Sequence, residues 1–385
     1  MIEFDEKPTQ VGSVIKIVGI GGAGGNAINT MIENNLSGVE FIAANTDMMD
    51  LQKSKAKLKL QIGKKSTKGL GTGANPELGR QAAEESKEDL SSHLEGADMV
   101  FIAAGMGGGT GTGGAPVVAK IARDLGILTL GIVSRPFESE GLRRKQNAEE
   151  GIKNLSEHVD TMIVIPNEKL KEIYSDMGII SAFHKADNVL YEAAKAVSDI
   201  INLSGYINVD FADVRTVMQN MGYALMGTGT AEGEGRAIHA AREALHNPLL
   251  SDVNLQGCQA LLINITAGSD MKMSELDEVS QVVISETGSA ANIIMGLIFD
   301  ESMQGRISVT VIATGLTCSE EQILAFSNIK PKSLEESGPD IKEILDRLKY
   351  TQPAHQEVPS ETRKEEPVPL SAVKTDIPSF LKALD

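Results

Sequence analysis

Two glycine-rich segments of this 385-residue sequence have residue types and spacing suited to binding an anion. Residues 19–24 fit the pattern G-x-G-x-x-G and follow an apolar run at residues 14–18. Residues 107–113 read G-G-G-T-G-T-G and follow a second apolar run at residues 99–104. Glycine lets backbone N–H groups approach a ligand closely, and successive free N–H groups form an anion-binding concavity. Two such loops at the ends of two strands predict a polyphosphate held from two sides.

The first loop alone has other interpretations. A glycine pattern of this kind after a strand, with Asp47 at about the distance of a ribose-binding acid, is also typical of an NAD-dependent dehydrogenase. A tight turn without a ligand is a third interpretation. The second loop favours the phosphate cradle, because five glycines in seven residues are costly unless the backbone wraps an anion. Pro116 is then expected to begin the next helix, and no G-x-x-x-x-G-K-[ST] motif occurs, so this is not an ordinary P-loop.

Alternating strands and helices must position these loops. Apolar runs with strand character alternate with helical stretches, which is the pattern of a doubly wound, mostly parallel α/β sheet; they lie at residues 14–18, 39–44, 99–104, 128–133 and 161–166. Ligands of such sheets bind at the carboxyl ends of the strands. The loops after Val18, Ala44, Ala104 and Val133 are therefore the candidate site.

A long helix is expected at residues 181–203, with apolar positions over so wide an arc that it must be buried on more than one side. We expect it to lie between two domains. A second, smaller α/β domain follows, with a helix near residues 211–222 and strands around residues 259–265, 291–296 and 307–313. After Gly315, seven of the 13 prolines are interleaved with Glu, Lys and Ser, which predicts disorder ending in an apolar patch at residues 376–381.

Composition limits the function classes. The 53 acidic residues outnumber the 36 basic ones, and a net charge of −17 repels nucleic-acid backbones. The two cysteines, Cys258 and Cys318, have no metal-type spacing and fit a reducing cytoplasm. No apolar run approaches the ~18 residues of a membrane span, and residues 1–10 do not read as a signal peptide.

The glycine run at residues 107–113 resembles the signature of the tubulin superfamily. Further matches are N-T-D, K-G-L-G-T-G-A-N-P, N-V-D-F-A-D-V and I-P-S-F-L, which begin at residues 45, 68, 208 and 377. Together they resemble the FtsZ family of bacterial cell-division GTPases, from about residue 14 to residue 315 and again in the tail. Ser139 departs from the family, which usually has an aromatic residue there.

The resemblance implies a domain organisation. It divides the chain into a flexible N-terminal arm (1–13), a GTP-binding domain (14–180), a central helix (181–203), a C-terminal activation and polymerisation domain (204–316), a disordered linker (317–375) and a partner-binding tail peptide (376–385).

The resemblance also implies the residues that bind GTP or GDP. The phosphates are expected to contact the two glycine loops and the loop that senses the γ-phosphate: Gly21, Gly22, Ala23, Gly24, Gly25, Asn26, Gly71, Gly73, Ala74, Gly108, Gly109, Thr110, Gly111, Thr112 and Gly113. Asn45, Glu140 and Arg144 are expected near the ribose and phosphates, although the last two could equally form a surface ion pair. Asp187 would accept the N1–H and N2–H₂ donors of guanine, and Phe183 would stack on the base.

Catalysis is expected to need a second subunit. The two glycine loops contain no carboxylate, histidine or lysine. By resemblance, Asn208, Asp210 and Asp213 of one subunit enter the nucleotide site of the next, where the two acids polarise the attacking water and Mg²⁺ neutralises the phosphates. The alternative is that Asp210 and Asp213 have no catalytic role and only cap the N-terminus of a helix. Head-to-tail stacking of this kind gives a filament.

The same resemblance implies partners and a location. The tail residues Asp376, Ile377, Pro378, Phe380 and Leu381 would dock on membrane-tethering and regulatory division proteins. The filament would form the cytokinetic ring at mid-cell. A dehydrogenase and a GTP-binding scaffold without hydrolysis are the alternatives.

Overall fold

The computed structural model describes residues 12–173, 178–202, 209–250, 255, 258–288 and 291–316. Several predictions fall outside these residues. They concern most of the N-terminal arm, Asn208, the linker from residue 317 with Cys318, and the tail residues Asp376, Ile377, Pro378, Phe380 and Leu381. In the described part, no helix is both long and apolar enough to cross a bilayer.

The N-terminal domain contains the predicted parallel sheet. Its strands are β1 (Ile15–Ile20), β2 (Val39–Asn45), β3 (Leu58–Gln61), β4 (Met99–Gly105), β5 (Leu128–Arg135) and β6 (Thr161–Pro166). They run in the order β3-β2-β1-β4-β5-β6, and all neighbours are parallel. The order reverses between β1 and β4, which is where doubly wound sheets bind ligands. The sequence did not predict β3, a four-residue edge strand with two exposed positions.

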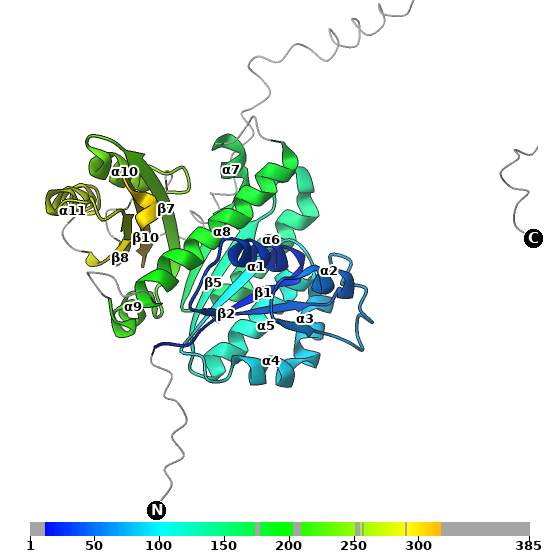
Figure 1. Cartoon of the computed structure of the whole chain (residues 1–385). Helices are drawn as coiled ribbons and strands as arrows, with labels where there is room; N and C mark the ends of the chain where they lie inside the picture. Colours follow the sequence, from blue (N-terminus) through cyan, green and yellow to red (C-terminus); the bar gives the residue numbers. More distant parts are fainter. Residues whose placement is uncertain are drawn as a thin grey trace, which may run out of the picture. The chain divides into compact units, whose positions relative to one another are not determined.

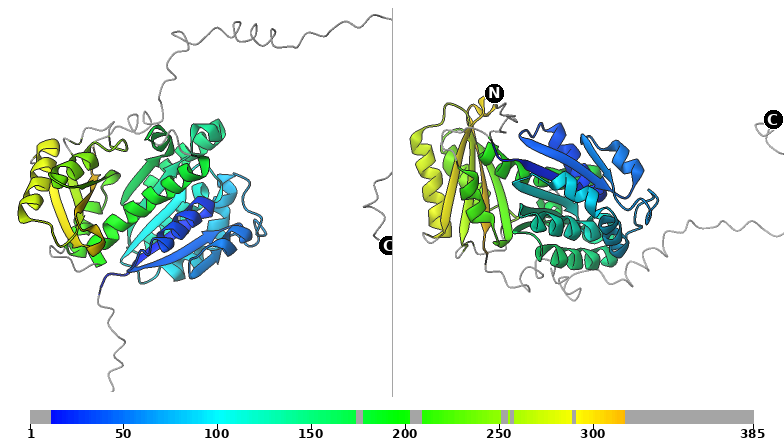
Figure 2. Two further views of the ribbon diagram at one scale, coloured as in Figure 1. Left: turned by 45° about the horizontal axis from the view of Figure 1, so that its top comes forward. Right: turned by 90° about the horizontal axis from the view of Figure 1, so that it is seen from below.

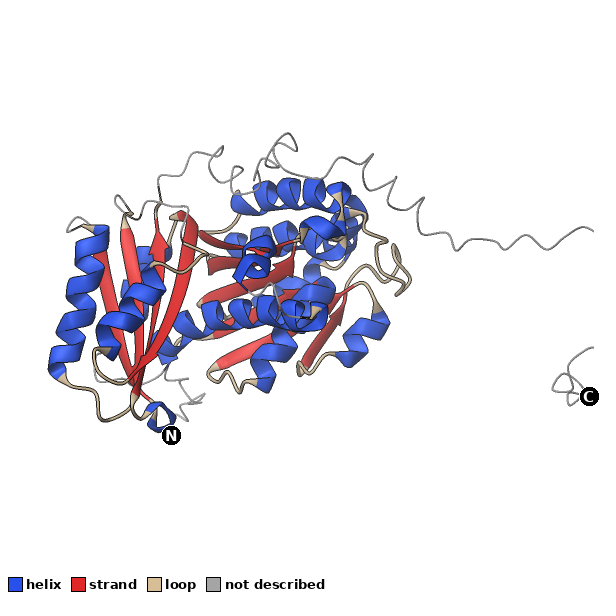
Figure 3. Cartoon of the chain, turned by 90° about the horizontal axis from the view of Figure 1, so that it is seen from above, coloured by secondary structure: helices blue, strands red, loops and turns tan. Residues whose placement is uncertain are grey.

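Helices cover both faces of this sheet, as Figure 3 shows. They are α1 (Gly21–Glu33), α2 (Met48–Lys53), α3 (Pro76–Glu85), α4 (Lys87–Leu94), α5 (Thr110–Asp124), α6 (Leu142–Ser156) and α7 (Asn167–Ile173), with a short 3₁₀ helix, η1 (Glu138–Glu140). Alternate strand residues enter different cores: Ile17 and Phe101 pack with α1, whereas Val18 and Ile102 pack with α3 to α6. Both faces are apolar because both are covered.

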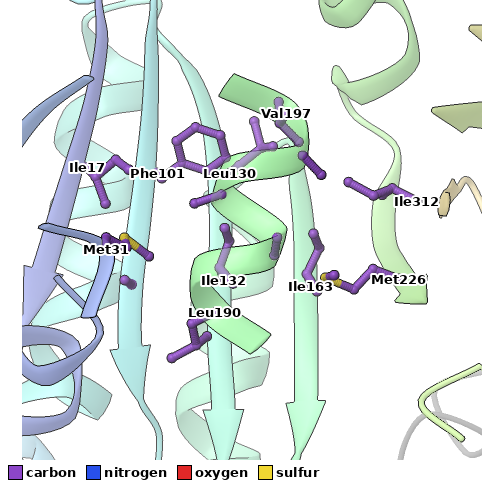
Figure 4. Close-up of a cluster of buried hydrophobic side chains, with 14 of the residues drawn as sticks. Ile17, Met31, Phe101, Leu130, Ile132, Ile163, Leu190, Val197, Met226 and Ile312 are labelled. Carbon is purple, nitrogen blue, oxygen red and sulfur yellow. The ribbon is translucent and has the colours of Figure 1, made fainter. Parts of the chain in front are cut away.

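The long central helix is α8 (Ile179–Asn202), which packs alongside α1 (Figure 2). Its Leu190 and Val197 belong to one hydrophobic core with Leu130 of β5 and with Met226 and Ile312, which lie beyond α8 in the sequence (Figure 4). The prediction that this helix is buried between two domains is confirmed.

The second domain is a smaller α/β unit. It contains α9 (Phe211–Met218), β7 (Gly222–Glu232), α10 (Arg236–Leu245), β8 (Ala260–Ala267), α11 (Met273–Thr287), β9 (Asn292–Phe299), η2 (Glu301–Met303) and β10 (Arg306–Thr314). Its strands follow the order β7-β10-β8-β9, with β10 antiparallel to both neighbours and β8 parallel to β9.

The sequence missed strand β7 and made the preceding helix too long. Helix α9 ends at Met218, and Asn220 and Gly222 then adopt positive φ angles of 56° and 70°, which turn the chain into the strand. Gly227 and Gly229 interrupt the strand pattern in the sequence. They are glycines because α10 packs directly on them: a Cβ on Gly227 would lie 2.1 Å from the Ala244 carbonyl oxygen. The start of β7 pairs with β6, so one ten-stranded sheet runs through both domains.

Candidate nucleotide-binding site

The two glycine loops meet where the strand order reverses. Ile20 at the end of β1 is in register with Ala104 near the end of β4, so α1 and the loop before α5 start side by side. The contact is close: a Cβ on Gly21 would lie 3.0 Å from the backbone nitrogen of Gly111. The expected convergence of both loops on one place is therefore present in the structure.

Both helices that begin at this junction have uncapped N-termini. Neither α1 nor α5 has a side-chain cap or an acidic residue in its first turn. Their neighbours differ, because Asp47 caps α2 and Asn75 caps α3. The first-turn N–H groups of α1 and α5 therefore have no cap acceptor, and the positive ends of two helix dipoles converge. This combination favours a bound anion such as a phosphate.

The prediction that Pro116 begins the second helix is wrong. Helix α5 begins at Thr110, inside the glycine run, and Pro116 lies in its second turn. Most glycines of the run are explained by packing, since a Cβ on Gly113 would lie 1.9 Å from the Pro76 carbonyl oxygen and one on Gly109 would lie 2.1 Å from Thr72 Oγ1. The argument that the run must wrap an anion therefore holds for only part of it.

Two glycines do border open space. A Cβ on Gly25 in α1 or on Gly108 before α5 would meet no heavy atom within 4 Å. Neither position has a positive φ angle, so packing and backbone geometry leave the choice of glycine unexplained there. Close approach of a ligand is the explanation that remains.

A cleft of 260 Å³ lies beside α1, between it and the β2–α2 connection. Among the predicted site residues it is lined by Gly21, Gly22, Gly25, Asn26 and Asn45. Ala23 and Gly24 belong to the same first turns of α1. A larger cleft of 480 Å³ between α3, α5 and α6 reaches Thr112 and Gly113 but touches none of the first glycine loop.

Asp47, the candidate ribose-binding acid of a dinucleotide site, is used differently. Its carboxylate accepts the backbone N–H groups of Met49 at 2.8 Å and Asp50 at 3.3 Å, and so caps α2. Asp50 lines the cleft and pairs with Lys53 at 3.2 Å. Because the Asp47 carboxylate already caps α2, it does not serve as the ribose-binding acid that a dehydrogenase would need.

The predicted base-binding residues lie on the first turns of α8. Phe183 is 45% exposed, and its ring meets the edge of Phe137 at a centroid distance of 5.2 Å and an angle of 84°. Asp187 follows one turn later and has no hydrogen-bond partner within the described part of the chain. Burial raises the pKa of Asp187 to about 6, and nearby His184 opposes the shift. Nothing in the sequence around Phe137 indicated its role as a support for Phe183.

Glu140 and Arg144 form the i,i+4 ion pair that the sequence left as one interpretation. Glu140 also accepts the backbone N–H of Phe137 at 2.9 Å, which ties the pair to the aromatic support. The carbonyl oxygen of Arg144 would lie 2.7 Å from a Cβ on Gly107, so α6 packs directly on the second glycine loop. The pair therefore borders the candidate site.

The loop before α3 approaches the second glycine loop. Gly71, Gly73 and Ala74 all have positive φ angles, and Ala74 at 60° is unusual for a residue with a side chain. Asn147 of α6, which the sequence analysis did not single out, donates from Nδ2 to the carbonyl oxygens of Ala74 at 3.3 Å and Gly107 at 3.5 Å. A lone asparagine inside a helix gives no sequence signal for such a bridge.

The candidate catalytic acids lie elsewhere. Asp210 and Asp213 are exposed at the start of α9, where the backbone N–H of Asp210 donates to the Asp213 carboxylate at 3.3 Å. The helix-cap interpretation is thus correct for Asp213. From Asp187 to Asn202, α8 extends about 22 Å at 1.5 Å per residue, and α9 lies near the end of α8 remote from α7 (Figure 1). The structure does not bring these acids to the phosphate loops of the same chain.

No side-chain metal centre is present in the described ranges, where no three acidic, histidine or cysteine residues gather closely enough to hold an ion. A Mg²⁺ that arrives with a nucleotide would take its ligands mainly from phosphate oxygens and water, as this ion commonly does.

Comparisons with known proteins agree with this geometry. The Tubulin/FtsZ family GTPase domain matches residues 14–175, and the FtsZ family C-terminal domain matches residues 222–317. The cell division protein FtsZ of Pseudomonas aeruginosa is 54% identical over 305 residues, which cover 79% of this chain and 77% of that protein. The protein of the same name from Azotobacter vinelandii is 47% identical, with 96% of both chains covered. A solved structure of an empty FtsZ dimer from M. jannaschii is 44% identical, with a TM-score of 0.76 over 80% of this chain and 89% of that chain.

Proposed function

The chain belongs to the FtsZ family of cell-division GTPases, and from that premise we propose that its GTP hydrolysis is completed between the subunits of a head-to-tail filament. The filament would form the cytokinetic ring at the bacterial division site. A dimer in the M. jannaschii structure supports self-association of this family.

In this proposal the phosphates bind between α1 and α5. The first-turn N–H groups of Gly22 to Gly25 contact the α- and β-phosphates, and Gly109, Thr110 and Gly111 contact the β/γ end. The uncapped helix ends support this assignment, because their donors have no cap acceptor among the residues that the structure describes. Gly71, Gly73 and Ala74 then lie against the terminal phosphate.

Guanine would bind at Phe183 and Asp187. An ionised Asp187 accepts from N1–H and N2–H₂ of guanine, whereas adenine would present an acceptor at N1 and leave the charge without a donor. The missing partner of this half-buried carboxyl supports the assignment, since binding guanine would satisfy it. Asn26, Asn45, Glu140 and Arg144 are the candidates for ribose and phosphate contacts.

One observation carries the proposal for hydrolysis. The phosphate cradle has N–H donors but no base in its loops, while Asp210 and Asp213 lie at the start of α9, near the far end of α8. A second copy stacked head to tail brings one subunit's acids to the other's phosphates, and such a contact repeats without closing. In the assembled site, Asp210 and Asp213 polarise the attacking water and Asn208 helps to orient it. Bound Mg²⁺ supplies charge neutralisation at the phosphates.

The test measures phosphate release per molecule against protein concentration. It should rise steeply, because only assembled sites are complete. Asp213→Ala should bind GTP as wild type does and hydrolyse it about 10²-fold more slowly, a typical loss for a general base. Asp277→Ala removes an exposed helix acid of the same domain and serves as the control.

Two outcomes would contradict the proposal. Turnover independent of concentration would show that one chain carries the whole site. Loss of turnover in Asp50→Ala, with Asp213→Ala unaffected, would transfer the role to the acid that already lies beside the first glycine loop.

The proposal extends to the C-terminal tail. Docking of Asp376, Ile377, Pro378, Phe380 and Leu381 on a membrane-tethering partner rests on the sequence resemblance alone. Removing the last ten residues should preserve assembly in solution and abolish recruitment to tether-bearing vesicles. Loss of assembly itself would overturn this role.

A further inference from the structure

Three buried threonine hydroxyls meet at the first residue of α5. Thr110 Oγ1 lies 2.7 Å from Thr46 Oγ1 and 3.3 Å from Thr72 Oγ1. Thr46 follows β2, and Thr72 belongs to the loop before α3, so three separate segments converge on Thr110. Thr46 is 0% exposed, and Thr72 and Thr110 are each 8% exposed. None of the interpretations above gives Thr46 a role.

The burial of Thr46 fixes the direction of its hydrogen bond. Its hydroxyl has Thr110 Oγ1 as its sole partner in the described ranges, and at 0% exposure it cannot reach bulk water. A hydroxyl has one proton to donate and two lone pairs to accept with. If Thr110 donated to Thr46, the proton of Thr46 would stay buried without an acceptor, which is costly. Thr46 therefore donates and Thr110 accepts.

Thr110 keeps its own proton for another acceptor. Within the protein, the longer 3.3 Å contact to Thr72 is the candidate. If an anion arrives at the start of α5, Thr110 donates to it, and Thr72 reverses and donates to Thr110. Each proton then has an acceptor, and hydroxyl chains of this polarity strengthen one another.

Two other fully buried threonines do not form such a chain. Thr129 on β5, also 0% exposed, donates to the Ile127 carbonyl oxygen at 2.9 Å, and Thr314 on β10 donates to the Val217 carbonyl oxygen at 2.8 Å. A backbone carbonyl ends a chain because it only accepts. Thr46 instead donates to a second hydroxyl, that of Thr110, which can itself donate to a further acceptor.

Thr46 also holds the loop that carries Thr72. Its carbonyl oxygen lies 3.4 Å from Thr67 Oγ1, and two residues later the backbone N–H of Met48 donates to the Gly69 carbonyl oxygen at 3.1 Å. The start and the middle of the loop between Thr67 and Thr72 are thus tied to the segment that starts at Thr46.

We propose that Thr46 is a positioning residue for GTP, whose donated hydrogen bond directs the Thr110 hydroxyl proton toward the terminal phosphate. The inference rests on the proposed function, which assigns the β/γ end of GTP to the start of α5. Thr46 itself touches no ligand and acts through Thr110.

The test compares GTP with GDP in the full-length chain, by titration with fluorescent analogues. Thr46→Val keeps the side-chain shape and removes the donor, so the Thr110 hydroxyl loses the hydrogen bond that orients it and strengthens its own donation. The preference for GTP over GDP should fall about five- to tenfold, a little less than a full hydrogen bond to a charged group provides. Thr46→Ser keeps the donor and should restore the ratio to within about twofold. Thr129→Val is the matched control, because it removes an equally buried hydroxyl from the same domain and should leave the ratio unchanged.

The results separate the inference from its premise. A wild-type GTP/GDP ratio in Thr46→Val, or a ratio in Thr46→Ser as low as in the valine variant, would overturn the role of Thr46. If Thr46→Val does not fold, Thr46→Cys replaces it, and its weak S–H donor should give a ratio below that of the serine variant. An equal ratio for cysteine and serine would also refute the inference. Failure of the wild-type chain to prefer any guanine nucleotide would instead refute the proposed function.

Discussion

Asp187 should make guanine-nucleotide affinity depend on pH in a range where an ordinary aspartate does not titrate. Burial raises its pKa from 3.8 to about 6 in the nucleotide-free protein. The two guanine groups that Asp187 would contact, N1–H and N2–H₂, are both donors, so the ionised carboxylate binds them and the protonated one, whose O–H has no acceptor there, does not. Affinity is therefore full above pH 7 and is lost as the pH falls through 6.

The magnitude follows from one proton in competition with the ligand. The apparent dissociation constant for GDP should roughly double at pH 6 and rise about tenfold by pH 5, relative to pH 8. The nucleotide-free protein should show the opposite sign in its stability. A raised carboxyl pKa means that folding favours the proton, so the stability contribution is present below about pH 4 and is lost as the pH rises through 6. At pH 7.5 the ionised carboxylate costs the folded state up to about 3 kcal/mol, because its pKa is about 6 in place of 3.8.

Asp187→Asn separates these effects. The β-phosphate of GDP also titrates near pH 6, so a pH profile of the wild type alone is ambiguous. The variant keeps the phosphate contacts, so any remaining pH dependence of its GDP affinity comes from titration of the β-phosphate. Subtracting the two profiles, measured by titration with fluorescent GDP, isolates Asp187. Thermal unfolding without nucleotide gives the second measurement.

The expected variant binds GDP roughly 10- to 100-fold more weakly at pH 7.5, since a hydrogen bond to a charged group is lost, yet it unfolds at a higher temperature when empty. Identical pH profiles for wild type and variant between pH 5 and 8 would refute the base-recognition role. A lower unfolding temperature for the empty variant would refute the burial argument.

Three further substitutions test the site at other points. The added methyl group of Gly25→Ala would meet no neighbouring atom, so thermal unfolding should show α1 stabilised by about 0.5–1 kcal/mol. The same variant should bind GDP more weakly, because the methyl group would obstruct a phosphate at this position. Unchanged affinity would show that no phosphate approaches Gly25. Gly113→Ala would set a Cβ 1.9 Å from the Pro76 carbonyl oxygen, so unfolding by urea should show a loss of at least about 2 kcal/mol, and a neutral result would contradict the close α3–α5 packing. Phe137→Leu removes the edge contact to Phe183 and should weaken GDP binding about two- to tenfold, as measured by competition with a fluorescent nucleotide. Wild-type affinity in this variant would show that binding of the base does not depend on Phe137.

The fold was largely predictable from the sequence because its strands are short, apolar and regularly followed by helices. Two strands, β3 and β7, were missed, and β7 shows the limit of that method. Gly227 and Gly229 interrupt its pattern for a reason that only tertiary structure reveals, namely the direct packing of α10 on the strand. Helix α9 was predicted too long because the turn at Asn220 has no glycine or proline at that residue.

Without the family resemblance, the candidate site was predictable only where backbone forms it. The two glycine loops follow strands in the sequence, so their meeting at the switch in strand order follows from topology. Asn147 and Phe137 reach the site through side chains on α6 and before η1, and no local pattern marks either one. Thr46 is similar, since its partner Thr110 lies 64 residues away.

The glycine run at residues 107–113 combines two roles. Gly109 and Gly113 allow α3 to pack on the start of α5, which brings Thr72 to Thr110, while Gly108 borders open space. Close packing therefore fixes the N–H groups that we propose to bind phosphate and the hydroxyl chain in one rigid unit. A substitution that disturbs this packing should alter phosphate recognition even without touching the ligand. The acids at the start of α9 belong to no such unit in the same chain, so phosphate binding and water activation can be separated by mutation, as Asp213→Ala and Thr46→Val should demonstrate.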